Sequence, residues 1–281
     1  MHFYNRDDVI QMTPLWTGER MEDGRPRVAD AVLTRMEKVT NEEAWSVLER
    51  CGYKFQFDGS MKMVHADRVL VGRAVTAVMV PKRPDLHDCL LEYGQQKEGR
   101  HGFFNVWVID SLVENDVVVV DMFDKIYEGT FSGGNLSTTI AARTKRGQVI
   151  YGGIRDLQQI VEIEHLQTYY RGVDPTPIRD VTLVGINIPC AIGSAICLPG
   201  DVVLGTPSGV TFIPPHLAEE CCLASERIRL QDLFGFERIR EGKYSSADID
   251  VHKWAPDIEA DFREWRQTHT PDDLQHLVWE D

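Results

Sequence analysis

The sequence of 281 residues lacks a disulfide framework, a long apolar run and an excess of positive charge. Its six cysteines show no CxxC spacing and are typical of small buried side chains in a reducing compartment. No segment approaches the roughly 18 apolar residues that a membrane-spanning helix needs. Residues 1–8 are polar and of mixed charge, without the apolar stretch of a signal peptide. These absences predict a cytoplasmic protein with no membrane partner.

Positive charge is scarce relative to negative charge. Lysine and arginine number 30 against 44 aspartates and glutamates, which leaves a net charge of -14. Such a chain repels a phosphate backbone, so we expect no nucleic-acid partner. An anionic small molecule remains compatible with this charge, because an arginine inside a pocket can override the global field. The sequence also contains no P-loop, GxGxxG or GxSxG motif.

Strand and helix patterns alternate through the middle of the chain, and this alternation predicts an α/β fold. We expect strands at 69–80, 117–123, 149–154, 182–188, 202–204 and 210–213, because these runs are rich in β-branched or apolar residues. Helical patterns occupy 28–39, 40–51, 107–112, 136–145, 157–165, 215–233 and 258–267. One catalytic domain is predicted over 28–235.

The segments outside this domain differ from it in composition. Residues 1–27 are polar with glycine and proline, and we expect an extended arm. Residues 236–281 form a second polar arm that carries Trp254, Trp265 and Trp279. Aromatic side chains on a polar tail favour docking on another surface, so we expect this arm to pack on a neighbouring subunit.

Two glycine-rich turns carry the chemical signal. Gly133 and Gly134 precede a predicted helix that begins with Asn135 and Leu136, and free N–H groups at a helix start favour a carboxylate or phosphate. The second turn, Gly152-Gly153-Ile154-Arg155-Asp156, lies between a predicted strand and helix. If the strands are neighbours, both turns open onto one crevice. Arg155 then suits a carboxylate through a two-pronged hydrogen bond, and Asp156 offers a hard oxygen to an ion such as Mg²⁺.

Structural roles explain the same residues equally well at this level. Asp156 with Gln159 matches a helix N-cap and its capping partner. Arg155 also fits a surface cation, and Gly133-Gly134 fits an ordinary tight turn. Spacing alone leaves these alternatives open.

Residues 133–160 (GGNLSTTIAARTKRGQVIYGGIRDLQQI) resemble the signature of the RraA-like family, which includes the 4-hydroxy-4-methyl-2-oxoglutarate aldolases. The resemblance continues through Pro199-Gly200-Asp201 and Ser208-Gly209-Val210 and covers roughly 28–235. It implies an α/β sandwich of the swivelling β/β/α type, here with N- and C-terminal extensions. It also implies assembly as a homotrimer or homohexamer.

The resemblance further implies a metal-dependent lyase, that is, a class II aldolase or oxaloacetate-type decarboxylase that releases pyruvate through an enolate. The backbone amides of Gly133, Gly134, Asn135 and Leu136 would hold a small 2-oxo acid. Arg155 would bind the substrate and stabilise the enolate, and Asp156 would be the direct protein ligand of Mg²⁺ or Mn²⁺. A carboxylate from a late helix of a neighbouring subunit, Asp232 or Glu226, would approach the waters of the metal.

The sequence departs from this pattern in the first turn. The catalytic aldolases carry an acidic residue where this chain has Gly134, and Ser208 stands in place of a second acidic residue. Asp30 is a candidate replacement for proton transfer, and Asp110 is a weaker one. The departure keeps open a hydratase or dehydratase on a related 2-oxo acid, or a non-catalytic protein-binding regulator. The regulator branch usually lacks the Asp after the Arg, so Asp156 favours an enzyme.

Overall fold

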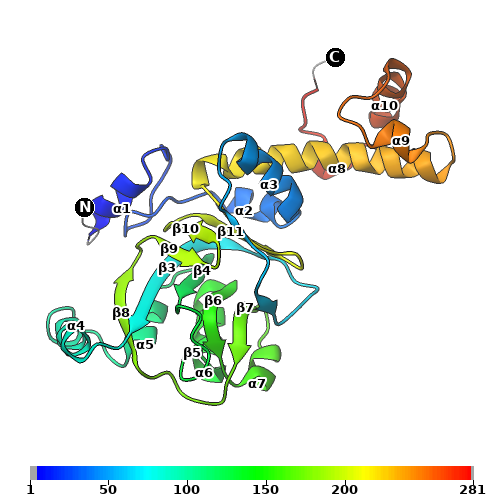
Figure 1. The fold of residues 1–281 in the computed structure, drawn as a ribbon. Helices are drawn as coiled ribbons and strands as arrows, with labels where there is room; N and C mark the ends of the chain where they lie inside the picture. The colour runs from blue at the N-terminus through cyan, green and yellow to red at the C-terminus, as the bar shows by residue number, and fades with distance from the viewer. Residues whose placement is uncertain (1–4, 280–281) are drawn as a thin grey trace.

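The computed structural model describes residues 5–279, and its centre is one mixed β-sheet (Figure 1). Four parallel strands form the middle of this sheet in the order β3 (Leu70–Pro81), β4 (Asp116–Asp121), β6 (Gly147–Ile154) and β7 (Gln167–Val173). Antiparallel strands flank them: β11 (Val202–Thr206), β12 (Gly209–Ile213) and β1 (Phe57–Asp58) beyond β3, and β2 (Lys62–Met63) beyond β7. The predicted strands at 69–80, 117–123 and 149–154 are therefore confirmed.

Three further pairings complete the strands. β8 (Val181–Ile186) runs antiparallel to the second half of β3, and β5 (Thr130–Ser132) runs parallel to the end of β6. β9 (Cys190–Ile192) and β10 (Ala195–Cys197) form a separate two-stranded ribbon.

The sheet divides the interior into layers because successive side chains of a strand point to opposite faces. Val118 and Val120 of β4 face a core that includes α5 (Phe104–Asp110), α6 (Gly134–Thr144) and α7 (Leu157–Val161). Val117 and Val119 face the β9–β10 ribbon on the other side. All four valines are fully buried. The order ribbon, sheet, helices confirms the predicted α/β class.

A third cluster covers the β11–β12 end of the sheet. Here α2 (Asp30–Met36), α3 (Asn41–Arg50), η1 (Pro215–Leu217) and the first turns of α8 (Ala218–Arg240) bury their apolar faces against Val202, Leu204 and Ile213. A capping box starts α3 at the predicted Thr40, since Thr40 accepts from the backbone N–H of Glu43 and Glu43 accepts from that of Thr40.

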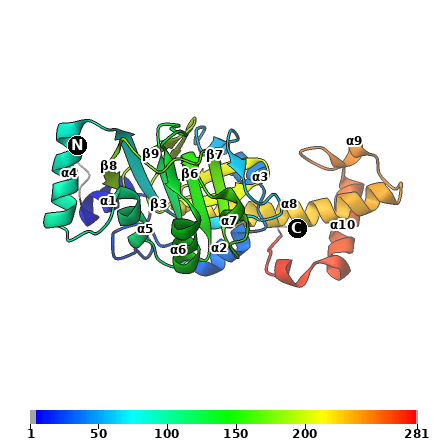
Figure 2. The same ribbon diagram turned by 90° about the horizontal axis from the view of Figure 1, so that it is seen from below.

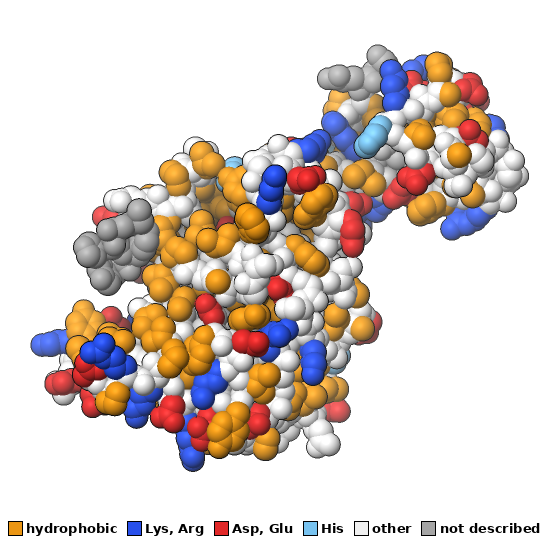
Figure 3. Space-filling model, viewed as in Figure 1, with side chains coloured by type: hydrophobic (Ala, Val, Ile, Leu, Met, Phe, Trp, Pro, Cys, Tyr) orange, Lys and Arg blue, Asp and Glu red, His pale blue; other side chains and the backbone are white. Residues whose placement is uncertain are grey.

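The distal half of α8 leaves the body and carries the C-terminal segment as a separate lobe (Figures 1 and 3). α9 (Ser246–Ile249), α10 (Pro256–His269) and η2 (Asp272–Leu274) wrap around Phe234. Trp254 and Trp265 lie 5.3 and 5.7 Å from the Phe234 ring, measured between centroids, and Trp279 lies 5.2 Å from Phe262. The three tryptophans therefore pack within their own chain, and docking of this arm on a neighbouring subunit stays a prediction.

Several elements differ from the expected ones. The N-terminal arm is not wholly extended, because Asn5 and Asp8 form a capping box that starts α1 (Arg6–Met12). α4 (Pro84–Gln96) was not predicted, and it stands at the end of the molecule opposite α10 (Figure 2). α8 continues seven residues beyond the predicted end at 233, whereas α7 ends at Val161 instead of 165. Within residues 5–279, none of the helices has the length and apolar character to cross a bilayer.

Candidate functional site

The two glycine-rich turns lie at the same edge of the sheet. β5 ends at Ser132 and leads through Gly133 into α6, while β6 ends at Ile154 and leads through Arg155 and Asp156 into α7. β5 and β6 are parallel neighbours, with Ser132 opposite Ile154. The two strands therefore end side by side, and the helix that follows each of them begins at the same end of the sheet. The backbone N–H of Arg155 donates to the carbonyl oxygen of Ser132 at 3.0 Å and joins the two turns directly.

The glycine pair allows the second turn to approach closely. A Cβ atom on Gly133 would lie 2.3 Å from Oδ2 of Asp156 and 2.9 Å from Cγ of Arg155. A Cβ atom on Gly134 would lie 1.9 Å from Oε1 of Gln159. Both contacts are far inside van der Waals separation, so a side chain at Gly133 displaces residues of the second turn and one at Gly134 displaces the end of the Gln159 side chain on α7. The glycines are therefore more than an ordinary tight turn.

Asp156 directs its carboxylate at the first turn and not at its own helix. Its φ of 55° places the backbone in the left-handed region, which costs a non-glycine residue on the order of 1 kcal/mol. The side chain makes no capping hydrogen bond to α7. Instead Oδ2 accepts from the backbone N–H of Gly134 at 3.1 Å, and the side chain keeps 38% exposure. Asp156 therefore occupies the predicted N-cap position of α7, but its side chain does not cap the helix.

The Arg155 guanidinium stays open to solvent, with 43% of the side chain exposed. Its Nε lies 3.7 Å from Oδ2 of Asp156, a distance of ionic contact and not of a hydrogen bond. No buried ion pair holds it among the residues that the structure describes. The guanidinium fork therefore remains available to a planar anion such as a carboxylate.

A cavity of about 310 Å³ opens between these turns. Its walls combine the two turns with side chains from α5, β5 and the loop before β8: Asn105, Thr130, Phe131, Gly133, Asn135, Leu136, Arg155, Asp156, Gln159, Pro177 and Ile178. Arg155 and Asp156 are the charged residues of this lining. A small anion beside the N-terminus of α6 meets both the guanidinium and the helix amides.

A buried polar network supports the first turn from below. Ser132 Oγ donates to Gln148 Oε1 at 2.8 Å, Ser137 Oγ donates to Ser132 Oγ at 3.2 Å, and Gln148 Nε2 donates to Ser137 and Thr168, each at 3.1 Å. All four side chains are fully buried. Satisfied buried networks are rigid, because breaking one bond leaves an unpaired polar group. The sequence signal for it, a glutamine within the apolar strand β6, was overlooked.

Asp156 suits a divalent ion that keeps most of its water ligands. Within residues 5–279, no group of three or more His, Cys, Asp or Glu side chains is placed to hold a metal. A site built on one carboxylate fits Mg²⁺, which typically takes one or two protein carboxylates and retains several waters. Asp156 meets this requirement, since it is partly exposed in the cavity and oriented by the Gly134 amide.

Asp30 lies outside this cavity. Its Oδ1 accepts from Nη1 of buried Arg73 at 2.7 Å, and this hydrogen bond lowers the pKa of Asp30. In the β3–β4 register Arg73 lies opposite Asp116, at the amino end of β4, whereas Arg155 follows the carboxyl end of β6. Asp30 and Arg155 therefore lie at opposite ends of the parallel strands. Within one chain, the expected catalytic role of Asp30 is therefore not supported. Asp110 is also absent from the cavity, since it lies at the end of α5, 3.4 Å from Nη2 of Arg143.

Glu226 is committed to its own chain. Arg35 donates to it through Nε at 2.6 Å and Nη2 at 2.9 Å, and Nε2 of His276 lies 3.0 Å from its Oε2. Burial by itself raises the pKa of Glu226, but the hydrogen bonds from Arg35 and His276 outweigh burial and lower it. The side chain is only 5% exposed, so it is poorly placed to reach another subunit.

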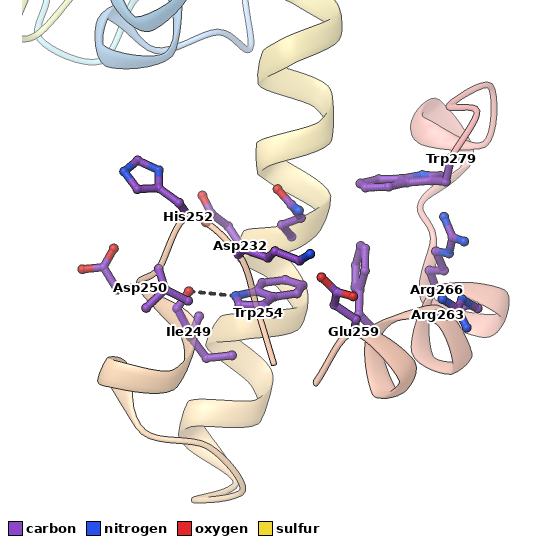
Figure 4. A pocket seen from close by; sticks show the side chains of 13 residues that line it. Asp232, Ile249, Asp250, His252, Trp254, Glu259, Arg263, Arg266 and Trp279 are labelled. Carbon is purple, nitrogen blue, oxygen red and sulfur yellow. Dashed lines mark hydrogen bonds between the residues drawn. The ribbon is translucent and has the colours of Figure 1, made fainter. Parts of the chain in front are cut away.

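Asp232 lies further along α8 and lines a second cavity, about 470 Å³, between α8 and the C-terminal lobe (Figure 4). Burial, and then the charge of Glu43, raise the pKa of Asp232. Figure 4 shows Asp232, Asp250 and Glu259 arranged around Trp254, whose indole N–H donates to the carbonyl of Ile249 at 2.8 Å. Although this cavity is larger, it contains no glycine-rich helix start. The smaller cavity is therefore the candidate functional site.

Fold and site together define an α/β protein that gathers helix amides, a guanidinium and a carboxylate at the carboxyl ends of its parallel strands. The model of the RraA-like family, described as Aldolase/RraA, matches residues 26–212, and the chain belongs to this family.

Two sequence relatives match the middle of the chain. "Uncharacterized protein MJ0644" of Methanocaldococcus jannaschii is 25% identical over 134 residues, 47% of this chain and 64% of that protein. A Halalkalibacterium halodurans protein named "Putative 4-hydroxy-4-methyl-2-oxoglutarate aldolase" is 26% identical over 134 residues, 46% of this chain and 61% of that protein. The chain thus spans less than two thirds of the length of either relative.

A solved structure shares the fold. Streptomyces coelicolor RraAS2, described as an unusual member of the RNase ES inhibitor RraA protein family, superposes with a TM-score of 0.62 at 20% identity. The match covers 79% of this chain and 98% of that one. The predicted RraA-like fold is therefore confirmed.

Proposed function

We propose that this chain is a divalent-metal-dependent lyase that cleaves a carbon–carbon bond of a small 2-oxo acid and releases pyruvate. One observation carries the proposal: the Gly133–Gly134 turn and the Arg155–Asp156 pair line one cavity, and the Asp156 carboxylate is held by the Gly134 amide. The aldolase named among the relatives supports the reaction class. Retro-aldol cleavage and oxaloacetate-type decarboxylation both fit, because both leave a pyruvate enolate.

In this proposal, different residues of the two turns bind the substrate and the metal ion. The N–H groups of Asn135 and Leu136 at the start of α6 and the Arg155 fork bind the substrate carboxylate and orient the 2-oxo group toward Asp156, whereas the Gly134 N–H holds Asp156 and not the substrate. Asp156 would hold Mg²⁺ or Mn²⁺, and a bound divalent ion supplies polarisation of a carbonyl oxygen. Arg155 also stabilises the negative charge that develops as the bond breaks, since a preorganised cation is worth more there than in water.

Proton transfer needs a group that the single-chain cavity does not supply. Asp156 is the one carboxylate in its lining, and Gly134 replaces the acidic residue of the aldolases. Solvent water, or a carboxylate from another copy in a homotrimer or homohexamer, would serve. Asp232 fits this role better than Glu226, because Arg35 and His276 already occupy Glu226.

The test is a pyruvate-release assay across oxaloacetate and several 4-hydroxy-2-oxo acids. We expect turnover with Mg²⁺ or Mn²⁺, loss of turnover after exhaustive chelation with EDTA, and recovery when metal is returned. The Asp156→Asn variant, which keeps the size of the side chain, should lose activity and metal binding measured by titration calorimetry. Asp85→Asn on exposed α4 is the matched control and should behave as wild type.

Full activity after chelation would exclude the metal mechanism. Hydration or dehydration without pyruvate release would indicate a related enolate reaction at the same site. A chain that turns over none of these substrates but still binds a protein partner after Asp156→Asn would be a regulator and not an enzyme.

A further inference from the structure

A third cavity, about 240 Å³, lies far from the glycine-rich turns, under the chain that follows α1. Residues 12–16 cover it, and its floor comes from β10, the Pro-Gly-Asp turn and the segment before η1. Arg20 holds the cover in place, since it donates to Thr13 Oγ1 at 2.8 Å, to Thr13 O at 2.9 Å and to Trp16 O at 3.1 Å. The cover is thus an ordered part of the fold.

The polar groups of this cavity are mainly hydrogen-bond acceptors. Asp201 is 2% exposed, and its carboxylate accepts one backbone N–H, from Leu198 at 2.8 Å. Gln56 also lines the cavity, and its amide nitrogen donates to the carbonyl oxygens of Phe212 at 2.6 Å and Ile196 at 3.4 Å. His216 lies 3.3 Å from the Tyr53 hydroxyl, and burial lowers its pKa, so its imidazole stays neutral at pH 7.

No lysine or arginine is among the residues that line this cavity. Its other walls are apolar or aromatic and include Met12, Leu15, Trp16, Tyr53 and Leu198. A buried carboxylate without a cation is costly, and burial raises the pKa of Asp201 to about 8. A cation that entered the cavity would meet the carboxylate and the faces of aromatic rings, which also attract cations.

We propose that this cavity is a binding site for a small primary amine with an apolar body, whose ammonium group pairs with Asp201 while its body contacts Trp16, Tyr53 and Leu198. Benzylammonium suits the space, because a cavity of roughly 150 Å³ already accepts benzene. A primary ammonium group offers three N–H donors, and the Asp201 carboxylate, which accepts one hydrogen bond in the folded chain, can accept from it. The site is separate from the proposed 2-oxo acid site, and its occupancy does not depend on lyase activity.

Titration calorimetry with benzylammonium, and with neutral benzyl alcohol of nearly the same shape, tests the assignment at pH 8.5, where Asp201, whose pKa burial raises to about 8, is largely ionised. We expect saturable binding of benzylammonium and at least about tenfold weaker binding of the alcohol, the effect of losing one charge-assisted hydrogen bond. Asp201→Asn should weaken the ammonium at least about tenfold and leave the alcohol within about twofold. The control Glu19→Gln removes an exposed carboxylate from the same N-terminal arm and should change neither.

Absence of saturable benzylammonium binding to the wild-type chain, or equal binding of the alcohol, would overturn the proposal. Because Asp201 also holds a turn, circular dichroism must show that Asp201→Asn folds. Leu198→Phe provides a second variant that keeps the carboxylate and fills the space. It should abolish binding of both probes, and unchanged ammonium binding by this variant would place the amine elsewhere.

Discussion

The Asp156 carboxylate accepts a hydrogen bond from the Gly134 backbone N–H at 3.1 Å, across two turns that are 22 residues apart in sequence. This bond uses an N–H at the start of α6 to orient the carboxylate that we propose as the metal ligand. The left-handed backbone of Asp156 makes the contact possible, because it turns the side chain away from α7.

Adding one methyl group to the first turn should disrupt this arrangement. In Gly133→Ala the new Cβ lies 2.3 Å from Oδ2 of Asp156 and 2.9 Å from Cγ of Arg155. Both side chains must move, and a displacement near 1 Å is expected to lower kcat/KM on the order of a hundredfold. Kinetics together with thermal unfolding measure the effect. Unchanged kcat/KM in a folded variant would show that the two turns need not meet for catalysis.

Removing the guanidinium should affect activity far more than stability. Arg155 is 43% exposed and holds no buried ion pair, so Arg155→Ala should change the free energy of unfolding by about 0.5 kcal/mol or less. Turnover should fall by at least about a hundredfold, since transition-state charge loses its cation. Arg83→Ala, an exposed arginine on the α4 side, is the control. Turnover of Arg155→Ala within a few-fold of wild type would refute its role.

The Gln159 side chain occupies the space beside Gly134. Substitutions at these two positions test whether an acidic residue at position 134, as in the aldolases, would transfer protons. In Gly134→Asp the new Cβ lies 1.9 Å from Oε1 of Gln159, so the glutamine must move. The end of a flexible side chain can rotate away, so we expect the single variant to lose little stability and the double variant with Gln159→Ala to recover that loss. If an acidic residue here relays protons, the double variant should exceed wild type in aldol cleavage. A double variant no more stable than Gly134→Asp would contradict the steric relation.

Burial of Asp201 predicts an unusual dependence of stability on pH. Its pKa in the folded chain is raised to about 8, whereas an exposed aspartate titrates near ~3.9. Between these values the folded state holds a proton that the unfolded state has released, so stability falls as pH rises. The slope approaches ~1.4 kcal/mol per pH unit for one proton. Denaturant unfolding of wild type and Asp201→Asn at pH 5 and pH 8 should show a larger loss of stability in wild type than in the variant.

Local sequence patterns were sufficient to predict most helices and strands and their order along the chain. The segments that became β3, β4 and β6 are continuous apolar or β-branched runs, and Thr40 with Glu43 marks a helix start, so neighbouring residues carry the information. The glycines and Arg155–Asp156 were found as candidate residues for the same reason. α4 and β7 were missed, because their apolar positions acquire a buried face only after they pack against distant strands.

Which residues meet was decided by tertiary structure. Pairing of β5 with β6 places the two turns together, and the sequence does not encode that pairing as a local signal. Long-range ion pairs decide which carboxylates can bind a ligand. Arg73 engages Asp30 and Arg35 engages Glu226, whereas Asp156 remains available to a metal ion. A carboxylate has the same chemistry in every sequence, but its partners come from strand order and packing. The sequence alone determined which groups are present and which elements carry them, and the fold determined which of them act together.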